Sequence, residues 1–381
     1  MSISDTLAGF TVLDVSQGIA GPYCAQLLGD LGARVIKIEP PEGDWGRRAG
    51  ERVGGSSSMF EVFNRGKEGL VLDLKTPRGL AGAKRLAAHA DVFIENARVG
   101  SMQRLGLGYD VLRAINPALV CTSISGFGQR GPYASRPATD TVMQSYTGLA
   151  VGASGTGWPV RLRVAFVDLV TGIYASHATV AALLKRLKTG SGQHLDISLA
   201  HAMASLQNYK IVDEAVQGTT GQAEAFAVIG IFEARDGAFA ISAASDRQVL
   251  ATLSALGCGE LVDDPRFSAP ESRQANQALI RERMSAKIAL RTVDECMQVL
   301  EAAGVPCQRV LSYTDLMRDA QVRALGLFQW IDTCDAVSIP IVRAPGLDAA
   351  ALGGASGPTS RAPALGEHTN MILAEFQREP R

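Results

Sequence analysis

Cysteine is scarce in this 381-residue chain, and its placement excludes several kinds of site. No two cysteines form the CxxC pair that zinc knuckles and redox dithiols require. The six residues lie far apart, at positions 24, 121, 258, 296, 307 and 334. Disulfide frameworks are typical of short secreted chains with dense cysteines. We therefore expect reduced, mostly buried thiols.

An excess of charge of either sign is also lacking. The 37 Lys and Arg residues nearly balance the 38 Asp and Glu residues, and the chain has no Lys-rich block that would neutralise many phosphates. We therefore expect no nucleic acid as a partner. The amino terminus has no cationic segment followed by an apolar core, and no later segment has about 18 uninterrupted apolar residues, the length that a membrane span requires. The pattern predicts a cytoplasmic protein without a membrane partner.

Nucleotide-binding motifs are absent as well, although the chain contains 40 glycines. The segment AGPYCAQLLGDLG (20–32) follows the first expected strand without a GxGxxG pattern, and no GxxxxGK[ST] occurs. Neither a nicotinamide dinucleotide site nor a P-loop is supported. We interpret most of these glycines as turn residues.

The sequence does contain an alternation of strands and helices. FTVLDVS (10–16), RVIKIEP (34–40), GLVLDL (69–74), DVFIEN (91–96) and ALVCTSISGFG (118–128) are short apolar runs separated by single helical stretches. This order predicts an open α/β domain with a mainly parallel sheet covered on both faces. Ligands bind beyond the carboxyl ends of such strands, so the residues that follow DVFIEN and SISGFG are candidates for a site.

The rest of the chain suggests a second, smaller domain, as the chain length also does. A single helix is expected over 198–216, followed by a polar crossing. VIGIFEARDGAFAISAAS (228–245) predicts a hairpin turning at Asp236 and Gly237, and helices and a strand at 304–310 follow it. We interpret this block as an α+β domain. The tail ends in a short helix that could pack on the first domain.

Asp168 is a candidate functional carboxylate at the start of an expected helix. It follows the apolar run 164–167 and precedes a long amphipathic pattern, so it lies where a helix begins. A carboxylate in this place can be a structural N-cap. The neighbouring small residues, which include Thr171, Gly172 and Ala175, would also let a substrate approach a nucleophile. Both interpretations remain open on the pattern alone.

Seven ordered blocks give the chain a specific likeness to a known family. They are VLDVSQGIAGPYCAQLLGDLGARVIKIEPPEGD, NRGKEGLVLDLK, ENARVGSMQRLGLGYDVL, SISGFGQRGPY with ATDTVMQSYTGL, VDLVTGIYAS, KTGSGQHLDISL and APALGEHT. In these blocks the chain resembles the class III coenzyme A transferases, a family that also contains the 2-methylacyl-CoA racemases.

The resemblance implies a large Rossmann-like domain over residues 1–205, completed by the tail 330–381. It also implies a linker over 206–224, a small α+β domain over 225–329, and an interlocked homodimer. Acyl-CoA and a carboxylic acid would be the substrates, and no metal or prosthetic group would be needed.

The family's nucleophilic aspartate falls on Asp168. In the implied mechanism this carboxylate attacks an acyl-CoA thioester and becomes an aspartyl-CoA thioester, which an acceptor carboxylate then resolves. The residues implied to bind CoA or substrate are Ser16, Gln17, Gly18, Ile19, Ala20, Lys75, Asn96, Ala97, Arg98, Arg104 and Asp140.

Three departures from the family pattern bear on the substrate. Oxalate-using members carry glutamine where Ile19 stands, which argues against oxalate. Relatives commonly have glycine at Arg163, and an arginine there could pair with the distal carboxylate of a succinyl-like substrate or simply lie at the surface. The segment GTTGQAEAF (218–226) lacks the glycine run that forms a mobile lid in some relatives.

Two other functions remain as alternatives. A 2-methylacyl-CoA racemase would pair the same aspartate with a histidine, whereas this chain has Thr139 and Asp140 in the matching segment and no histidine between His89 and His177. A non-catalytic CoA-binding protein is the other alternative. No histidine has a metal-ligand spacing to another candidate ligand.

Overall fold

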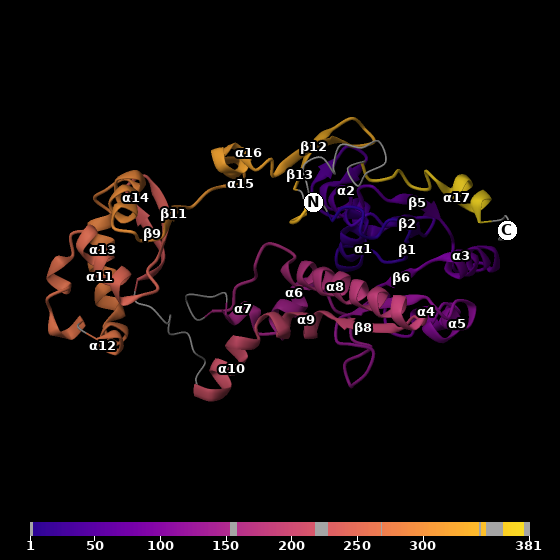
Figure 1. Cartoon of the computed structure of the whole chain (residues 1–381), viewed down its shortest axis with the longest axis horizontal. Helices are drawn as coiled ribbons and strands as arrows, with labels where there is room; N and C mark the ends of the chain where they lie inside the picture. The colour runs from indigo at the N-terminus through magenta and orange to yellow at the C-terminus, as the bar shows by residue number, and fades with distance from the viewer. Residues whose placement is uncertain are drawn as a thin grey trace. The chain divides into compact units, whose positions relative to one another are not determined.

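The computed structural model describes residues 3–152, 158–217, 228–267, 269–342, 344–347 and 361–376. Two compact units make up the chain (Figure 1). The first comprises residues 1–219 and 326–381, and the second comprises residues 220–325. The candidate lid segment 218–226 and the Gly/Ser/Pro-rich part of the tail, 353–360, lie outside the described residues.

The first unit is built on a six-stranded parallel sheet, as the alternation of strands and helices predicts. Its strands lie in the order β5-β2-β1-β6-β7-β8. Their bounds are β1 Thr11–Asp14, β2 Arg34–Glu39, β5 Glu68–Val71, β6 Val92–Glu95, β7 Val120–Ser125 and β8 His194–Ser198. The order runs outward in both directions from the adjacent strands β1 and β6, as in doubly wound α/β folds. Binding sites in such folds lie where the order reverses.

Helices cover both faces of this sheet. The bounds of the main covering helices are α1 Ala20–Asp30, α3 Pro77–His89, α5 Tyr109–Ile115 and α8 Phe166–Thr189. Helices α1 and α8 contribute Leu28 and Ala182 to the hydrophobic core on one face, and α3 and α5 contribute Leu86 and Leu112 to the core on the other. Apolar faces on both sides explain why the strands are almost continuously hydrophobic.

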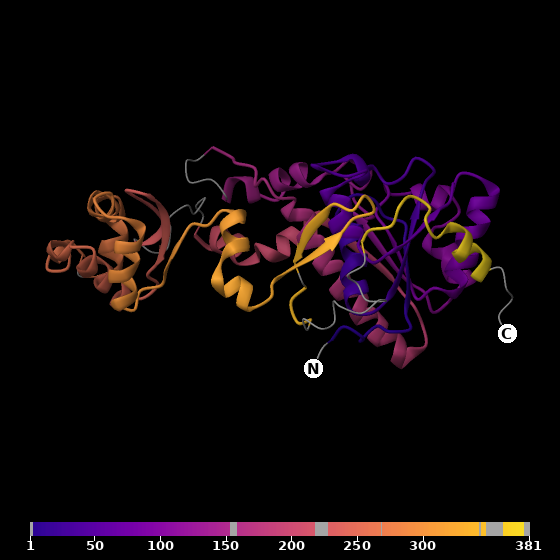
Figure 2. The same ribbon diagram turned by 90° about the horizontal axis from the view of Figure 1, so that it is seen from above.

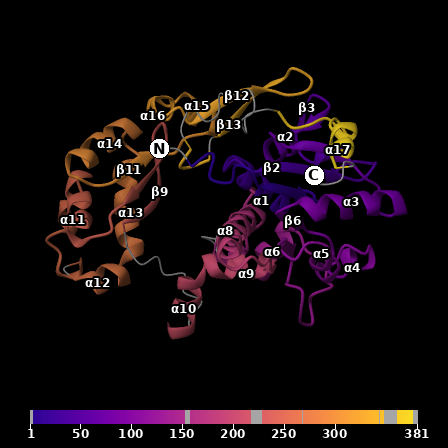
Figure 3. The same ribbon diagram turned by 45° about the vertical axis from the view of Figure 1, so that its right-hand side comes forward.

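Helices α1 and α8 lie side by side (Figures 1 and 3). A Cβ atom added at Gly172 would lie 2.9 Å from Tyr23 Cδ1 and 3.0 Å from the Ala20 carbonyl oxygen, so glycine permits this approach.

By length and composition alone α8 would qualify as a membrane-crossing helix, but 50% of its most apolar window is buried. That burial is expected of a core helix.

In the six-stranded sheet and the helices that follow it, the sequence-based expectation misses one strand and one break between helices. Strand β8 is the sixth strand, and it escapes detection because it is only partly buried at the edge of the sheet and has no apolar run. The single helix expected over 198–216 is two helices, α9 Leu199–Leu206 and α10 Asn208–Gln217. They are separated at Gln207, whose side-chain amide donates to the Thr147 carbonyl. Helix α10 lies inside the expected linker 206–224.

The carboxyl-terminal part of the chain belongs to the first unit. Gly69 of β5 donates its backbone N–H to His368 Nδ1 at 3.0 Å, and helix α17 (Thr369–Glu375) buries Ile372 in the core beside α3. Figure 2 shows this helix, in yellow, at the edge of the unit that also contains α3. A two-stranded hairpin, β12 Phe328–Asp332 and β13 Ser338–Val342, precedes it and was not anticipated from the sequence.

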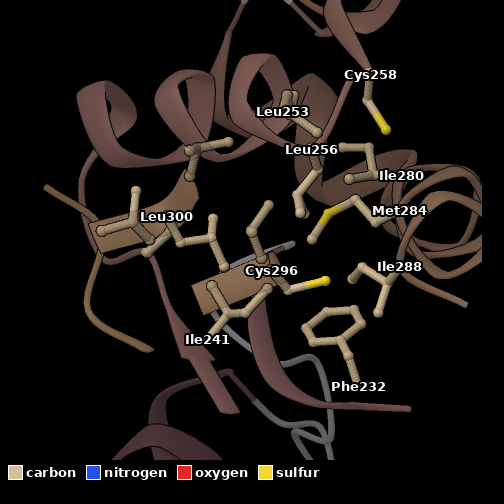
Figure 4. Packing of buried hydrophobic residues seen from close by; sticks show 14 of the residues in the cluster. Phe232, Ile241, Leu253, Leu256, Cys258, Ile280, Met284, Ile288, Cys296 and Leu300 are labelled. Atoms are coloured by element: carbon tan, nitrogen blue, oxygen red, sulfur yellow. The ribbon is translucent and has the colours of Figure 1, made fainter. Parts of the chain in front are cut away.

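The second unit contains the predicted hairpin. Strand β9 (Ile229–Ala234) pairs antiparallel with β10 (Gly237–Ser242), and β11 (Cys307–Arg309) joins the other edge of β10. The α-helices in its described part are α11 Asp246–Ala255, α12 Pro270–Ala275, α13 Gln277–Ile288, α14 Val293–Ala302, α15 Tyr313–Arg318 and α16 Ala320–Ala324. Figure 4 shows Phe232 and Ile241 of the sheet facing Met284 and Ile288 of α13 in a shared core. Cys258 and Cys296 are buried there as free thiols.

Candidate active site

A cavity of about 820 Å³ opens at the carboxyl ends of the central strands. Residues that follow β1, including Gln17 and Ile19, line it together with residues that follow β6, including Asn96 and Arg98. Since β1 and β6 are neighbours at the point where the strand order reverses, the cavity lies at the switch point of the sheet. Its size suits a cofactor-sized or substrate-sized ligand.

The loop after β1 is fixed against the loop after β6. The Gln17 N–H donates to Asn96 Oδ1 at 2.8 Å, and Asn96 Nδ2 donates to the Gln17 carbonyl at 2.7 Å. Gly18 has φ +80°, and a Cβ there would lie 2.2 Å from Trp45 Cζ2. Only glycine therefore allows both the turn and the Trp45 contact. The side chains of Gln17, Asn96 and Trp45 all line the cavity.

Asp168 lies at the cavity in the first turn of α8, as the sequence predicts. Its interpretation as an N-cap is wrong. The N-cap position is Ala165, which has no side chain that could cap, and Asp168 is the third residue of the helix. Its carboxyl group makes no hydrogen bond within the described part of the chain.

Asp140 supplies the cap instead. It begins helix α6 (Asp140–Tyr146), is buried, and accepts hydrogen bonds from the backbone N–H groups of Val167 at 2.8 Å and of Asp168 at 3.3 Å. The same Asp140 carboxylate accepts from Gln144 Nε2 at 2.6 Å. A carboxylate from a neighbouring helix thus accepts two backbone amides in the first turn of α8 and leaves the Asp168 side chain available.

Two effects raise the pKa of Asp168 to about 7. The larger one is burial, which disfavours the charged carboxylate, and the second is the negative charge of Asp140. A carboxyl group lining a cavity with such a pKa is a candidate functional group on physical grounds.

Gln144 holds the backbone just ahead of Asp168. This fully buried side chain accepts from the Leu162 N–H at 2.9 Å and donates to the carbonyls of Leu162 at 3.2 Å and Val164 at 3.3 Å. Arg163, between them, is exposed, makes no hydrogen bond or ion pair with any described residue, and is not among the residues that line the cavity. These observations favour the surface interpretation of Arg163.

The candidate residues from the sequence divide into two groups. Those that line the cavity are Gln17, Ile19, Ala20, Lys75, Asn96, Ala97, Arg98 and Asp168. Those outside its lining are Ser16, Gly18, Arg104 and Asp140. Ser16 is fully buried and hydrogen-bonded to Asp14, and Arg104 Nη2 donates to Ser101 Oγ at 2.9 Å.

Sequence reasoning missed several lining residues. Trp45 and Glu42 come from the loop after β2, Asp73 precedes Lys75, and Thr139 precedes Asp140. Ser125, the last residue of β7, and Gly126, which follows it, also line the cavity. Both lie within SISGFG, just before the residues that the strand-end rule had indicated. The same rule applied to β2 would have pointed to Glu42 and Trp45.

The cavity contains no histidine among the described residues that line it. No cluster of three or more His, Cys, Asp or Glu residues that could hold a metal ion occurs within the described ranges. The site as described consists of one carboxyl group of raised pKa, polar backbone at two strand ends, and the cations Lys75 and Arg98.

Comparison with known proteins identifies relatives of the whole chain. The sequence profile described as "CoA-transferase family III" matches residues 7–369. A "Succinate--glutarate CoA-transferase" of Agrobacterium fabrum is 32% identical over 97% of this chain and 96% of its own length. An "Acetyl-CoA:oxalate CoA-transferase" of Acetobacter aceti is 35% identical over 83% of each chain. The crystal structure of a CaiB/BaiF family protein from Brucella suis superposes with a TM-score of 0.85, at 34% identity, covering 98% of this chain and 100% of that one.

Proposed function

The chain belongs to CoA-transferase family III, and on that premise we propose that it moves CoA from a short acyl-CoA to a carboxylic acid with Asp168 as the nucleophile. The observation that carries this assignment is the unbonded Asp168 carboxyl group at the switch-point cavity, with its backbone capped by a second carboxylate. The cap leaves the nucleophile's own oxygens free for chemistry.

The proposed reaction begins when an Asp168 carboxylate oxygen attacks the thioester carbonyl of the donor. The C–S bond breaks, which gives a mixed anhydride of Asp168 and the donor acid, together with CoA thiolate. The thiolate attacks the aspartyl carbonyl and expels the donor carboxylate, so that Asp168 becomes an aspartyl-CoA thioester. The acceptor carboxylate repeats these steps in reverse, and no net proton is consumed.

The pKa of Asp168 fits this chemistry. A carboxylate of raised pKa is a stronger nucleophile than an ordinary one, and about half of it is ionised near pH 7. The protonated half of Asp168 cannot attack, so the carboxyl group must lose its proton before the reaction begins. Each attack forms an oxyanion beside the backbone of the 16–20 loop, which we propose as its stabilising environment.

For CoA we propose contacts with the lining residues that come after β5 and β6. Lys75 and Arg98 supply positive charge for the phosphates, and Asn96 and Ala97 supply polar backbone after β6. We propose a smaller contribution to CoA binding from Arg104, because its side chain is hydrogen-bonded to Ser101 and does not line the cavity. No prosthetic group takes part in the proposed mechanism.

The names of the relatives support a dicarboxylic acid as the acceptor. One is named for succinate and glutarate and another for oxalate, all of which are dicarboxylic acids. We propose a dicarboxylic acid longer than oxalate as the acceptor, because Ile19 stands in the cavity where oxalate-using relatives have glutamine. A screen of dicarboxylic acids of increasing length against succinyl-CoA, with release of the acceptor's CoA ester as the readout, tests this directly.

We propose further that two chains form a homodimer. Residues 208–216 of α10 are all exposed, and they include Tyr209, Ile211, Val212 and Val216. An isolated helix of ten residues is marginal in water without tertiary packing, and this one has apolar side chains to bury. Analytical ultracentrifugation at nanomolar concentration tests the assembly, since a stable monomer would rule it out.

A further inference from the structure

Six ionisable side chains form a buried network directly beneath the Ser16–Gly18 loop. They are Asp14, Lys37, Glu39, Asp44, Arg47 and Lys67. Three carry negative charge and three carry positive charge, so the network is balanced. Lys37, Asp14 and Asp44 are 0% exposed. Such a group is costly to desolvate, and the mechanism proposed above uses none of its members as a reacting group.

The network reaches the loop through backbone atoms. Asp44 accepts from the Gly18 N–H, at 3.1 Å to Oδ1 and 3.3 Å to Oδ2, and from Lys37 Nζ at 2.8 Å. Lys37 Nζ also donates to the Ser16 carbonyl. The Ser16 N–H donates to Asp14 Oδ1 at 3.0 Å. The residues on both sides of Gln17 are therefore held by buried charges.

Contacts of two further residues, Lys67 and Glu39, keep the network itself in place. Lys67 Nζ donates to Asp14 at 2.7 Å, to the Pro22 carbonyl at 2.9 Å and to Asn64 at 2.9 Å. Glu39 accepts from the Asp44 N–H at 2.9 Å and pairs with Arg47 at 2.7 Å. Every charged group has a partner of fixed geometry, so the loop cannot move without breaking charge-assisted bonds.

We infer that Asp44 and Lys37 are positioning residues of the transfer reaction, which hold the Ser16–Gly18 backbone so that Gln17 faces the reacting thioester. This inference rests on the proposed function for its catalytic consequence. Buried ion pairs are weak sources of stability, because desolvation offsets their attraction. Their value here lies in the geometry of the loop that borders the cavity.

The test compares two deletions of a buried carboxylate. Asp44→Ala removes the acceptor of the Gly18 N–H. Asp30→Ala is the matched control, since Asp30 is 2% exposed and pairs with Arg65 at 2.8 Å but does not line the cavity. We expect Asp44→Ala to lower kcat at least about 30-fold with the KM for acyl-CoA within about threefold, whereas Asp30→Ala keeps kcat within about twofold.

Hydrogen exchange supplies a readout that does not depend on activity. We expect amide protection in the peptide spanning residues 15–19 to fall in Asp44→Ala and to stay unchanged in Asp30→Ala, measured by mass spectrometry below both melting temperatures. Unchanged protection of this peptide, or a kcat of Asp44→Ala within threefold of wild type, overturns the inference. If the wild-type enzyme transfers no CoA, the proposed function fails. Hydrogen exchange in residues 15–19 then decides by itself whether Asp44 holds the Ser16–Gly18 loop.

The double variant Lys37→Met/Asp44→Asn covers the case in which Asp44→Ala does not fold. It removes both charges together, which proteins tolerate better than an unpaired buried charge. The Ser16 carbonyl loses its Lys37 donor, so we expect the same selective loss of kcat and of protection in residues 15–19. Wild-type values for both would contradict the assignment.

Discussion

Asp140 lies against the first turn of α8, where its carboxylate accepts the backbone N–H of Asp168 at 3.3 Å. Asp140 is thus a buried cap outside the cavity lining, and Asp168 lines the cavity with a free carboxyl group. The cap orders the backbone of the nucleophile, and its charge helps to raise the pKa of Asp168 to about 7, after the larger effect of burial.

Replacing Asp140 with Asn separates these two effects. An asparagine oxygen still accepts the N–H of Val167, but it carries no charge, so the pKa of Asp168 should fall. We expect the acidic limb of the pH profile of kcat/KM, near pH 7 in wild type, to move about one unit lower. Measuring kcat/KM from pH 5 to 9 checks this. Asp213→Asn on the exposed helix α10 serves as the control and should leave the acidic limb of the pH profile in place. If Asp140→Asn also leaves the acidic limb in place, the charge of Asp140 does not raise the pKa of Asp168.

The stability of the enzyme should report the same pKa. Because the pKa of Asp168 is higher in the folded than in the unfolded protein, its protonated form favours folding, and this contribution disappears as the pH rises from about 4 through about 7. The Asp168→Asn variant lacks this penalty. We expect it to be more stable than wild type at pH 8, by on the order of 1–3 kcal/mol, and the difference to vanish near pH 4. Urea unfolding of both proteins at the two pH values measures it, and a pH-independent difference would argue against a raised pKa.

Lys75 should contribute to binding rather than to chemistry. A cation that contacts the phosphates of CoA stabilises the bound substrate and the transition state equally. We expect Lys75→Ala to raise the KM for acyl-CoA about tenfold with kcat within about threefold, and Arg104→Ala to have a smaller effect of the same kind. Arg78→Ala, an exposed neighbour outside the cavity lining, should leave both constants unchanged. A large fall in kcat at constant KM for Lys75→Ala would contradict this role.

Arg163 provides a test of acceptor recognition. Its side chain is exposed and does not belong to the cavity lining, so we expect Arg163→Ala to leave the KM for a dicarboxylic acceptor within about twofold. Steady-state kinetics with glutarate and with a monocarboxylate of equal length decide the point. A KM that rises tenfold for glutarate alone would show that Arg163 reads the distal carboxylate.

Much of the first unit could be predicted because its strands are buried on both faces. Short apolar runs such as residues 92–94 and 119–121 are easy to recognise, and the alternation with helices indicates the parallel sheet. Strand β8 gave no such signal, because a half-exposed edge strand lacks a hydrophobic run. The break between α9 and α10 depends on a tertiary contact of Gln207, which no local pattern reveals.

The sequence predicts that Asp168 lies at the start of a helix, but it does not reveal which residues surround this carboxyl group. Local sequence shows that a carboxylate begins a helix, and the N-cap interpretation followed from that alone. The true cap, Asp140, lies 28 residues earlier and meets α8 only in the folded chain. The same holds for Asp44 and Gly18, which are 26 residues apart and are joined by hydrogen bonds from the Gly18 N–H to both Asp44 oxygens. Long-range polar contacts of this kind have no periodic signature.

The covalent intermediate is the central claim, and mass spectrometry tests it most directly. Wild-type enzyme is mixed with succinyl-CoA without an acceptor, treated with hydroxylamine or borohydride, and digested. The account predicts a hydroxamate or a reduced side chain on Asp168 and no other carboxylate, with the Asp168→Asn variant unlabelled and unable to transfer CoA. Label on a different residue, or CoA transfer by purified, folded Asp168→Asn within tenfold of wild type, would contradict it.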